Sequence, residues 1–358
     1  MDCRYCIRAL RALVYADAYF NTASSIHMQI CVVRLSSREE RIKMIVYKEL
    51  SSLETDLGIP AKTLYAVSNS LSRHYRTVAI PKRDGTERLL SVPDPLLKHI
   101  QQQIANVLLR LEPVSPHATA YRPGSSVIGN AQPHIGKKFL LKLDILHFFD
   151  SVLYSDVKRR AFPESRYSEQ NRILLTMLCY YRDSLPQGAP TSPAISNIIL
   201  YPFDCAVGEW CRERRIDYTR YSDDMTFSGS FDPAEVTAFV GNELRRHGFF
   251  LNPKKTVTAD RAQRQLVTGI VVNKEPHTAR EYRRAVRQEL YYCRKFGVEA
   301  HLRQTGQSLS PVAYLQKLYG RARYILFVDP SDRSAQQACE MVAGWLRAAA
   351  DKPETNVK

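Results

Sequence analysis

Two adjacent acidic residues, Asp223 and Asp224, interrupt a segment that otherwise favours a β-strand. Most of their neighbours at 218–227 are tyrosine, threonine, methionine or phenylalanine, whereas aspartate is depleted in strands. Two carboxylates side by side repel each other unless a cation lies between or beneath them. A third carboxylate, Asp144, belongs to an apolar run at 139–145 that is typical of a buried strand. If the two segments are neighbouring strands of one sheet, the three carboxylates converge.

Converging carboxylates suit magnesium, which takes hard oxygen ligands from one or two carboxylates and completes its shell with water and substrate phosphates. Two such ions clamp the attacking and the leaving oxygen of an in-line phosphoryl displacement. The alternative for Asp223 and Asp224 is a polar hairpin turn that binds no metal. The doublet alone does not decide between these two interpretations.

Other residues that suit nucleotide chemistry are spread along the chain. Gln187 offers an amide beside Gly188, which lets a backbone approach a ligand closely, and Phe149 could pack beneath a sugar. Three cations of a predicted hairpin could hold a triphosphate, namely Lys82, Arg83 and Arg88. Each feature also has a structural alternative: an ordinary Pro/Gly loop, a core aromatic residue and a solvated charged turn.

The composition favours a polyanionic partner. The 358 residues contain 51 Lys or Arg against 36 Asp or Glu, a net charge of +15 that suits nucleic acid or an acidic membrane surface. No apolar run is long enough to span a bilayer, so we expect no membrane partner. Eight scattered cysteines favour reduced thiols and a cytoplasmic protein. The pair Cys3 and Cys6 has no second pair at zinc-ligand spacing.

The patterns along the chain predict an α+β fold with an antiparallel sheet backed by helices. A hairpin is expected around Asp84-Gly85. Helices, strands and a second hairpin are expected at 96–111 (helix), 139–145 (strand), 168–181 and 192–215 (helices, the second kinked at Pro202), 216–221 and 225–228 (hairpin), 233–249 (helix) and 264–273 (strand).

An amphipathic helix is predicted at 280–296. Five arginines share one face of it, and Tyr282, Val286, Leu290 and Cys293 share the other. The arginines are Arg280, Arg283, Arg284, Arg287 and Arg294. Residues 274–326 hold eleven Lys or Arg and four acids, an excess of seven positive charges. By itself this pattern is also that of a solvated surface helix.

The order of these motifs resembles the reverse transcriptases. A basic hairpin, an Asp followed by two aromatic residues, a Pro-Gln-Gly loop, a Tyr-x-Asp-Asp hairpin and "LNPKKT" follow one another over about residues 75–273. The resemblance implies a right-hand polymerase fold with fingers, an antiparallel palm sheet and a helical thumb. We accordingly predict an N-terminal extension (1–45), fingers (46–135), a palm (136–275, with finger insertions near 155–185), a thumb (276–350) and a disordered tail (351–358).

The same resemblance implies roles for the residues above. Asp144, Asp223 and Asp224 would be the catalytic ligands of two Mg²⁺ ions. The incoming dNTP would be bound by the hairpin cations Lys82, Arg83 and Arg88 together with Gln187, Lys255 and Phe149. Within that set, Phe149 would exclude a ribose 2′-hydroxyl and Lys255 would lie near the phosphates. The arginine face at 280–296 would be a thumb surface that grips a duplex backbone.

Two further elements resemble signatures of bacterial retron reverse transcriptases: "NAQPH" at 130–134 and "VTG" at 267–269. The resemblance implies RNA contacts by Asn130, His134, Val267, Thr268 and Gly269, and by Arg280, Arg284 and Arg287 of the thumb. From the residues alone, His134 could equally be a satisfied structural histidine, and Thr268-Gly269 could be a bulge or a packing point.

The retron resemblance implies an RNA-directed DNA polymerase that copies part of a structured non-coding RNA into multicopy single-stranded DNA (msDNA). It implies priming from a guanosine 2′-hydroxyl, a 2′–5′ branched product, and a role in antiviral defence with an effector protein. One alternative is a group II intron-like or diversity-generating reverse transcriptase, although no maturase-type extension is evident in these residues. Another is a catalytically idle RNA-binding scaffold, against which the three carboxylates argue.

Overall fold

The computed structural model describes residues 31–32, 43–44, 46–81 and 85–350. Several predictions lie outside these residues: most of the N-terminal extension with Cys3 and Cys6, the hairpin cations Lys82 and Arg83, and the tail 351–358.

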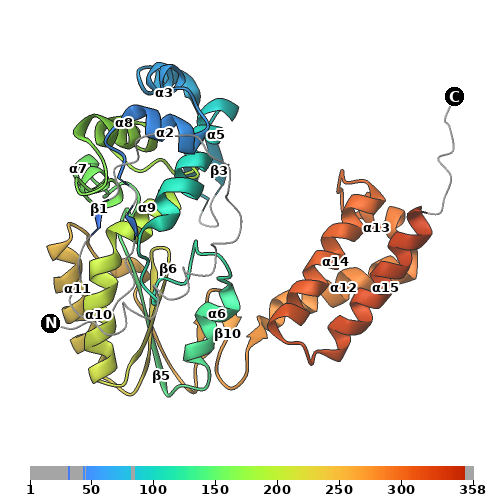
Figure 1. Cartoon of the computed structure of the whole chain (residues 1–358). Coiled ribbons are helices and arrows are strands. Elements are labelled where there is room, and N and C mark those ends of the chain that lie inside the picture. The colour runs from blue at the N-terminus through green and yellow to red at the C-terminus, as the bar shows by residue number, and fades with distance from the viewer. Residues whose placement is uncertain (1–30, 33–42, 45, 82–84, 351–358) are drawn as a thin grey trace, which may run out of the picture.

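The centre of the molecule is a four-stranded antiparallel sheet in the order β6-β7-β5-β8. Its strands are β5 (Phe139–Asp144), β6 (Asp217–Tyr221), β7 (Asp224–Gly229) and β8 (Val257–Asp260). The inner strands are buried along most of their length because helices cover the sheet, and Figure 1 shows α10 (Tyr201–Glu213) and α11 (Pro233–Arg246) along one side. The predicted α+β class with an antiparallel sheet is therefore confirmed.

Helices and one hairpin form the N-terminal half around the sheet (Figure 1). The hairpin consists of β3 (Tyr75–Pro81) and β4 (Glu87–Pro93), as the Asp-Gly turn predicts. The helices are α2 (Leu50–Leu57), α3 (Ala61–Ser68), α4 (Leu71–His74), α5 (Pro95–Gln103), α6 (Val127–Ala131), α7 (Tyr154–Asp156), α8 (Glu169–Cys179) and α9 (Ser192–Ile199). One hydrophobic core extends from Tyr47 to Phe249 and joins these helices to the sheet.

Local sequence explains where the elements begin and end. Asp94 caps α5 by accepting a hydrogen bond from the Leu97 amide at 2.8 Å, with Pro95 in the first turn. The predicted kink near Pro202 is a helix break, because α9 ends at Ile199 and α10 begins at Tyr201.

The single strand predicted at 264–273 is wrong. The segment forms a tight hairpin of β9 (Leu266–Val267) and β10 (Ile270–Val271), to which β11 (His277–Thr278) adds a third strand. Thr268 and Gly269 both have positive φ, of 44° and 85°, as the two central residues of a type I′ turn do. The Thr-Gly pair is therefore a turn and not a bulge.

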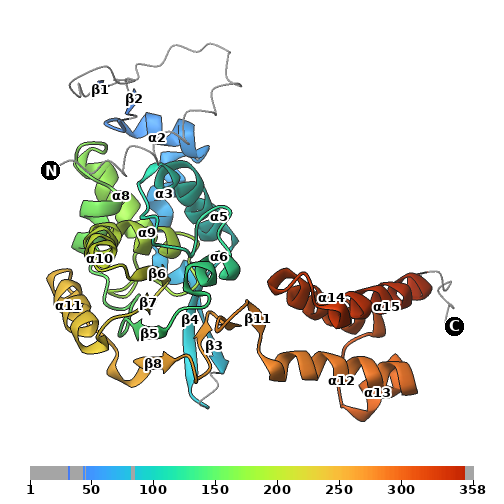
Figure 2. The ribbon, with the colours of Figure 1, turned by 90° about the horizontal axis from the view of Figure 1, so that it is seen from below.

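The last four helices form a separate bundle, called here the C-terminal bundle, which Figures 1 and 2 show beside the rest of the molecule. They are α12 (Arg280–Phe296), α13 (Val298–Gln304), α14 (Pro311–Val328) and α15 (Arg333–Ala350). The bundle has its own core, and a small third cluster joins Val328 to Val267 and Ile270 of the β9–β10 hairpin. No helix of the described residues is long and apolar enough to cross a membrane.

Candidate active site

The three predicted carboxylates lie together at one edge of the sheet. Asp144, the last residue of β5, is paired across the strands with Asp224, the first residue of β7. Asp223 precedes it in the two-residue turn that joins β6 to β7. Asp144 is buried, and burial together with the charge of Asp144 raises the pKa values of Asp223 and Asp224. Full ionisation of this group is therefore costly without a cation.

Both oxygens of Asp144 already have donors. Lys255 Nζ lies 2.8 Å from Oδ2, and Asn252 Nδ2 donates to Oδ1 at 3.0 Å. The backbone amide of Asn252 also donates to the backbone carbonyl of Asp144 at 2.8 Å, so the "LNPKKT" segment lies directly beside the carboxylates. The hydrogen bond to Asp144 raises the pKa of Lys255.

The chemistry of these side chains fits magnesium. Among the described residues, no three His, Cys, Asp or Glu side chains stand in an arrangement ready to hold a metal ion. The three carboxylates are nevertheless hard oxygen donors at one sheet edge. Burial, together with the charges of neighbouring carboxylates, raises the pKa values of Asp223 and Asp224, and a divalent cation would stabilise their ionised forms. A metal ion bound to Asp144 Oδ2 would share that oxygen with the Lys255 ammonium, or displace it.

A buried ion pair beneath the turn was missed from the sequence. Arg220 is fully buried and donates to Asp204 through Nε at 2.8 Å and Nη2 at 2.6 Å. Its Nη1 donates to the carbonyl of Ser222 at 2.9 Å, in the turn that carries Asp223. The Tyr218 hydroxyl completes the network by donating to Asp204 at 2.8 Å. The only signal in the sequence was an arginine between the threonine and tyrosine residues of a segment that favours a strand.

Ser222 itself has an unusual backbone. Its φ is +62°, a left-handed conformation that costs a non-glycine residue of the order of 1–3 kcal/mol. The Tyr121 hydroxyl donates to Ser222 Oγ at 3.0 Å, and Tyr121 also has a positive φ of 61°. Hydrogen bonds from Arg220 and Tyr121 therefore hold the turn in this conformation.

The Pro-Gln-Gly loop is attached to the β3–β4 hairpin. The Ser91 amide of β4 donates to the Gln187 carbonyl at 2.9 Å. Gly188 has φ +124°, and a Cβ there would lie 2.8 Å from the Ser91 carbonyl oxygen, so the close approach requires glycine. The half-buried Phe149 adjoins the same loop, because its carbonyl accepts from the Leu185 amide. Arg88 lies exposed on β4, paired with Ile80.

The two elements predicted to contact RNA are largely internal. His134 and Val267 are fully buried, and Asn130 is 1% exposed. Burial lowers the pKa of His134 to about 4. A direct side-chain contact with RNA by these three residues disagrees with the structure, because all three side chains are buried and the polar groups of Asn130 and His134 bond other protein groups. Of the five predicted contact residues in these elements, only Gly269 is exposed and Thr268 is partly exposed, although Gln132 and Pro133 of the "NAQPH" element also lie at the surface.

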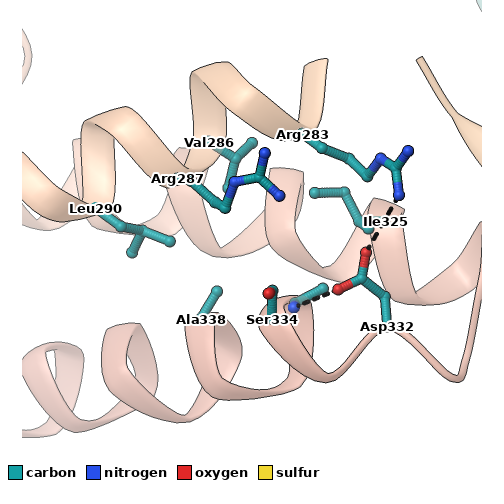
Figure 3. A pocket seen from close by; sticks show the side chains of 9 residues that line it. Arg283, Val286, Arg287, Leu290, Ile325, Asp332, Ser334 and Ala338 are labelled. Carbon is teal, nitrogen blue, oxygen red and sulfur yellow. Dashed lines mark hydrogen bonds and ion pairs between the residues drawn. The ribbon is translucent and has the colours of Figure 1, made fainter. Parts of the chain in front are cut away.

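The predicted two faces of α12 are confirmed. Val286, Leu290 and Cys293 are buried, whereas Arg280, Arg284, Arg287 and Arg294 are exposed. Arg283 differs from the other arginines. Figure 3 shows it pointing across the bundle to Asp332 at the start of α15, an ion pair of 4.0 Å, with Arg287 nearby on the same helix. Arg283 therefore connects α12 to the start of α15, and the cationic face of α12 consists of the other four arginines.

A family model described as reverse transcriptase (RNA-dependent DNA polymerase) matches residues 80–296. The retron Mx162 reverse transcriptase of Myxococcus xanthus is 32% identical over 335 residues, which cover 82% of this chain and 67% of the relative. The retron Mx65 reverse transcriptase of the same organism is 36% identical over 249 residues, and the match covers 64% of this chain and 58% of the relative.

A third relative, the retron Ec86 reverse transcriptase of Escherichia coli, is 29% identical over 274 residues, covering 74% of this chain and 85% of the relative. Among solved structures, a telomerase from Candida albicans matches with a TM-score of 0.41 and 12% identity, covering 78% of this chain and 66% of the other. A foamy viral protease–reverse transcriptase matches with a TM-score of 0.41 and 12% identity, covering 77% of this chain and 44% of the other.

Proposed function

Because the chain belongs to the reverse transcriptase family and its curated relatives are those of retrons, we propose that it is the RNA-directed DNA polymerase of a bacterial retron. The observation that carries the proposal is the pairing of Asp144 with Asp224, beside Asp223, at one edge of an antiparallel sheet. The sheet then corresponds to the palm of a right-hand polymerase, the β3–β4 hairpin to part of the fingers and the C-terminal bundle to the thumb.

Reverse transcriptases generally use divalent metal ions, and in this chain Asp144, Asp223 and Asp224 would hold two Mg²⁺. The ions supply charge neutralisation at the attacking and leaving oxygens of the nucleotidyl transfer. Lys255, 57% exposed at its side chain, is long enough to exchange its bond with Asp144 for a triphosphate oxygen. Arg88 on β4, with Lys82 and Arg83, which follow β3 in the sequence, would add positive charge for the same phosphates.

The half-buried Phe149 and the Gln187 loop form the proposed sugar and base side of the dNTP site. Their hydrogen-bonded neighbours, Leu185 and Ser91, fix both to the protein frame. A rigid aromatic ring at Phe149 leaves no room for a ribose 2′-hydroxyl, which selects dNTPs over ribonucleotides.

We further propose that the template is a structured non-coding RNA and that the product is msDNA joined to it by a 2′–5′ bond. The retron relatives support this assignment, as does the cationic face of α12, which suits a nucleic-acid backbone. A role in antiviral defence with an effector protein, in the bacterial cytoplasm, is part of the same proposal.

The test is isosteric removal of single charges. Asp223→Asn and Asp224→Asn should each abolish DNA synthesis on a primed RNA template in Mg²⁺, while RNA binding measured by filter retention stays within about twofold, because these groups face ions and not the RNA backbone. Asp260→Asn is the matched control, since Asp260 pairs with Phe139 at the opposite end of the same sheet. Primer extension by the Asp223→Asn protein at the wild-type rate would refute the assignment.

A further inference from the structure

His134 joins the two strands of the hairpin that carries Asp223 and Asp224. Its Nε2 lies 2.8 Å from Thr219 Oγ1 on β6, and its Nδ1 lies 2.7 Å from Ser228 Oγ on β7. All three side chains are buried, with Ser228 and His134 fully so. Both hydroxyls and both ring nitrogens are therefore satisfied by one another.

The imidazole suits this bridge in its neutral form. One nitrogen of a neutral ring donates and the other accepts, and a serine or threonine hydroxyl can take either complementary role. The burial that lowers the pKa of His134 to about 4 keeps the ring neutral at pH 7. Loss of the ring would leave two buried hydroxyls, one on β6 and one on β7, without their partner.

Asn130, four residues earlier, connects to the same hairpin by another route. Its Oδ1 accepts from Thr119 Oγ1 at 2.6 Å, and its Nδ2 lies 3.3 Å from Thr268 Oγ1. Thr119 in turn donates its backbone amide to the Arg220 carbonyl at 2.8 Å, and the hydroxyl that donates to Asn130 lies 3.1 Å from the same carbonyl oxygen. Since Arg220 donates to the Ser222 carbonyl, hydrogen bonds run without interruption from the "VTG" turn to the turn that bears Asp223.

We propose that Asn130 and His134 are positioning residues for the polymerase reaction, which fix the carboxylate hairpin through Thr119, Thr219 and Ser228, and that they do not read the RNA. The inference rests on the proposed function, because it assumes that this hairpin carries the metal ligands. It differs from the expectation drawn from the "NAQPH" signature, in which Asn130 and His134 identify the cognate RNA.

The two interpretations predict different substrate dependence. A positioning residue affects every template equally, whereas an RNA reader affects only the cognate RNA. The test compares His134→Leu and His134→Gln with wild type on two substrates, a DNA primer annealed to an unrelated RNA and the self-priming RNA encoded beside the gene. We expect kcat to fall about tenfold on both substrates in the leucine variant, with cognate-RNA Kd within about twofold of wild type. The glutamine variant, which retains a donor and an acceptor, should recover part of kcat.

Two controls separate positioning from general instability. His301 is a buried histidine of the C-terminal bundle whose Nε2 lies 3.1 Å from the Tyr314 hydroxyl. His301→Leu should lower the thermal midpoint while leaving kcat on the supplied primer within about twofold. If His134→Leu does not fold, Thr219→Val and Ser228→Ala serve in its place, because each removes only one hydroxyl. Each of them should show part of the expected loss of kcat.

Amide hydrogen exchange provides a readout that is independent of turnover. Peptides that cover 217–229 should exchange faster in His134→Leu than in wild type, whereas peptides of α14 should not change. If kcat of His134→Leu fell only in the self-primed reaction, and RNA binding were weaker, the proposal would be overturned in favour of RNA recognition. Wild-type kcat in Ser228→Ala, Thr219→Val and His134→Leu would also overturn it. Failure of the proposed function is seen separately, as DNA synthesis by Asp223→Asn.

Discussion

The residues around the carboxylates illustrate how an acidic turn is held in a strained conformation. Arg220 and Asp204 are both completely buried, and the desolvation of such a pair is repaid only when every remaining donor and acceptor is satisfied. Here the guanidinium also bonds Asn197 Oδ1 at 3.2 Å and the Ser222 carbonyl at 2.9 Å. The network thus connects two helices, α9 and α10, with strand β6 and the turn of Asp223.

This network leads to a prediction that separates stability from activity. Arg220→Met should lower the free energy of unfolding by about 3–5 kcal/mol, because Asp204 is left buried and unpaired. The triple variant Arg220→Met, Asp204→Leu, Tyr218→Phe should regain most of that loss in urea unfolding. DNA synthesis should stay low in both proteins, because the Ser222 carbonyl has lost its donor.

Two results would contradict this account. A triple variant no more stable than Arg220→Met would mean that the unpaired charge is not the cause of the instability. Wild-type activity in the triple variant would mean that the turn holds its conformation without the guanidinium.

At the residue scale, the sequence predicted the groups whose type conflicts with their surroundings. Asp144, Asp223 and Asp224 are acids in strand-like segments, so they could be recognised without a structure. Asp204 could not, because an acid on a helix is ordinary unless the helix face is known to be buried. Nor could the sequence show that the partners of His134 are Thr219 and Ser228, which lie 85 and 94 residues away in the chain.

At the scale of elements, the contact between the Pro-Gln-Gly loop and β4 is a close approach of two backbones. Gly188→Ala would place its Cβ 2.8 Å from the Ser91 carbonyl oxygen, a backbone atom that cannot move aside cheaply. We expect a loss of about 1–3 kcal/mol in the free energy of unfolding and a marked rise in KM for dNTPs, because the loop shifts with Gln187.

A matched glycine provides the control for this variant. Gly124 also has a positive φ, of +75°, but a Cβ there meets no heavy atom within 4 Å. Gly124→Ala should therefore show the backbone strain without the rise in KM, as measured by steady-state incorporation of single dNTPs. An equal KM in the two variants would show that the contact with β4 does not position the loop.

The exposed arginines of α12 make a second prediction at this scale. Reversing the charge of Arg284 and Arg287 should weaken RNA binding and make the plot of log K against log salt shallower by about two units, one for each lost phosphate contact. The control reverses two exposed cations on other helices, Lys62 of α3 and Arg245 of α11. An unchanged slope in the α12 variant would mean that this face is only solvated.

Helices and strands could be predicted where the turn residues or the spacing of apolar residues are distinctive. The Asp-Gly pair specified the β3–β4 hairpin, and the Arg and apolar spacing specified α12. The β9–β10 hairpin was predicted as one strand because each arm has two residues, too short for alternation to appear, and because Thr-Gly is not the usual Asn-Gly or Asp-Gly signal.

At the scale of the whole molecule, two bodies with separate cores meet at the β9–β11 strands. Strands β5 and β7, which carry Asp144 and Asp224, lie in one body, and α12 with its exposed arginines lies in the other (Figure 2). A folded RNA bound by both bodies is held at two distant places, which restricts its orientation. Because a small apolar cluster with Val328 is part of the junction, the two bodies are positioned by packing as well as by the connecting chain.

That arrangement bears on how synthesis begins. A primer with an ordinary 3′-hydroxyl enters along the duplex axis, whereas a 2′-hydroxyl of an internal nucleotide reaches the metal ligands only if the folded RNA is held in one pose. We therefore predict that the enzyme starts DNA synthesis on its own structured RNA without an added primer, and that unrelated RNAs fail in this reaction.

The product identifies the mode of priming. DNA made on the cognate RNA should remain joined to it through a bond that survives ribonuclease and is released by a 2′–5′ debranching enzyme, as followed on denaturing gels. Asp223→Asn should give no product, and reversal of Arg284 and Arg287 should reduce self-priming more than extension of a supplied primer, since only self-priming depends on the pose. Equal activity on any annealed primer and template, with no debranching-sensitive product from the cognate RNA, would instead indicate a reverse transcriptase that initiates on free 3′ ends.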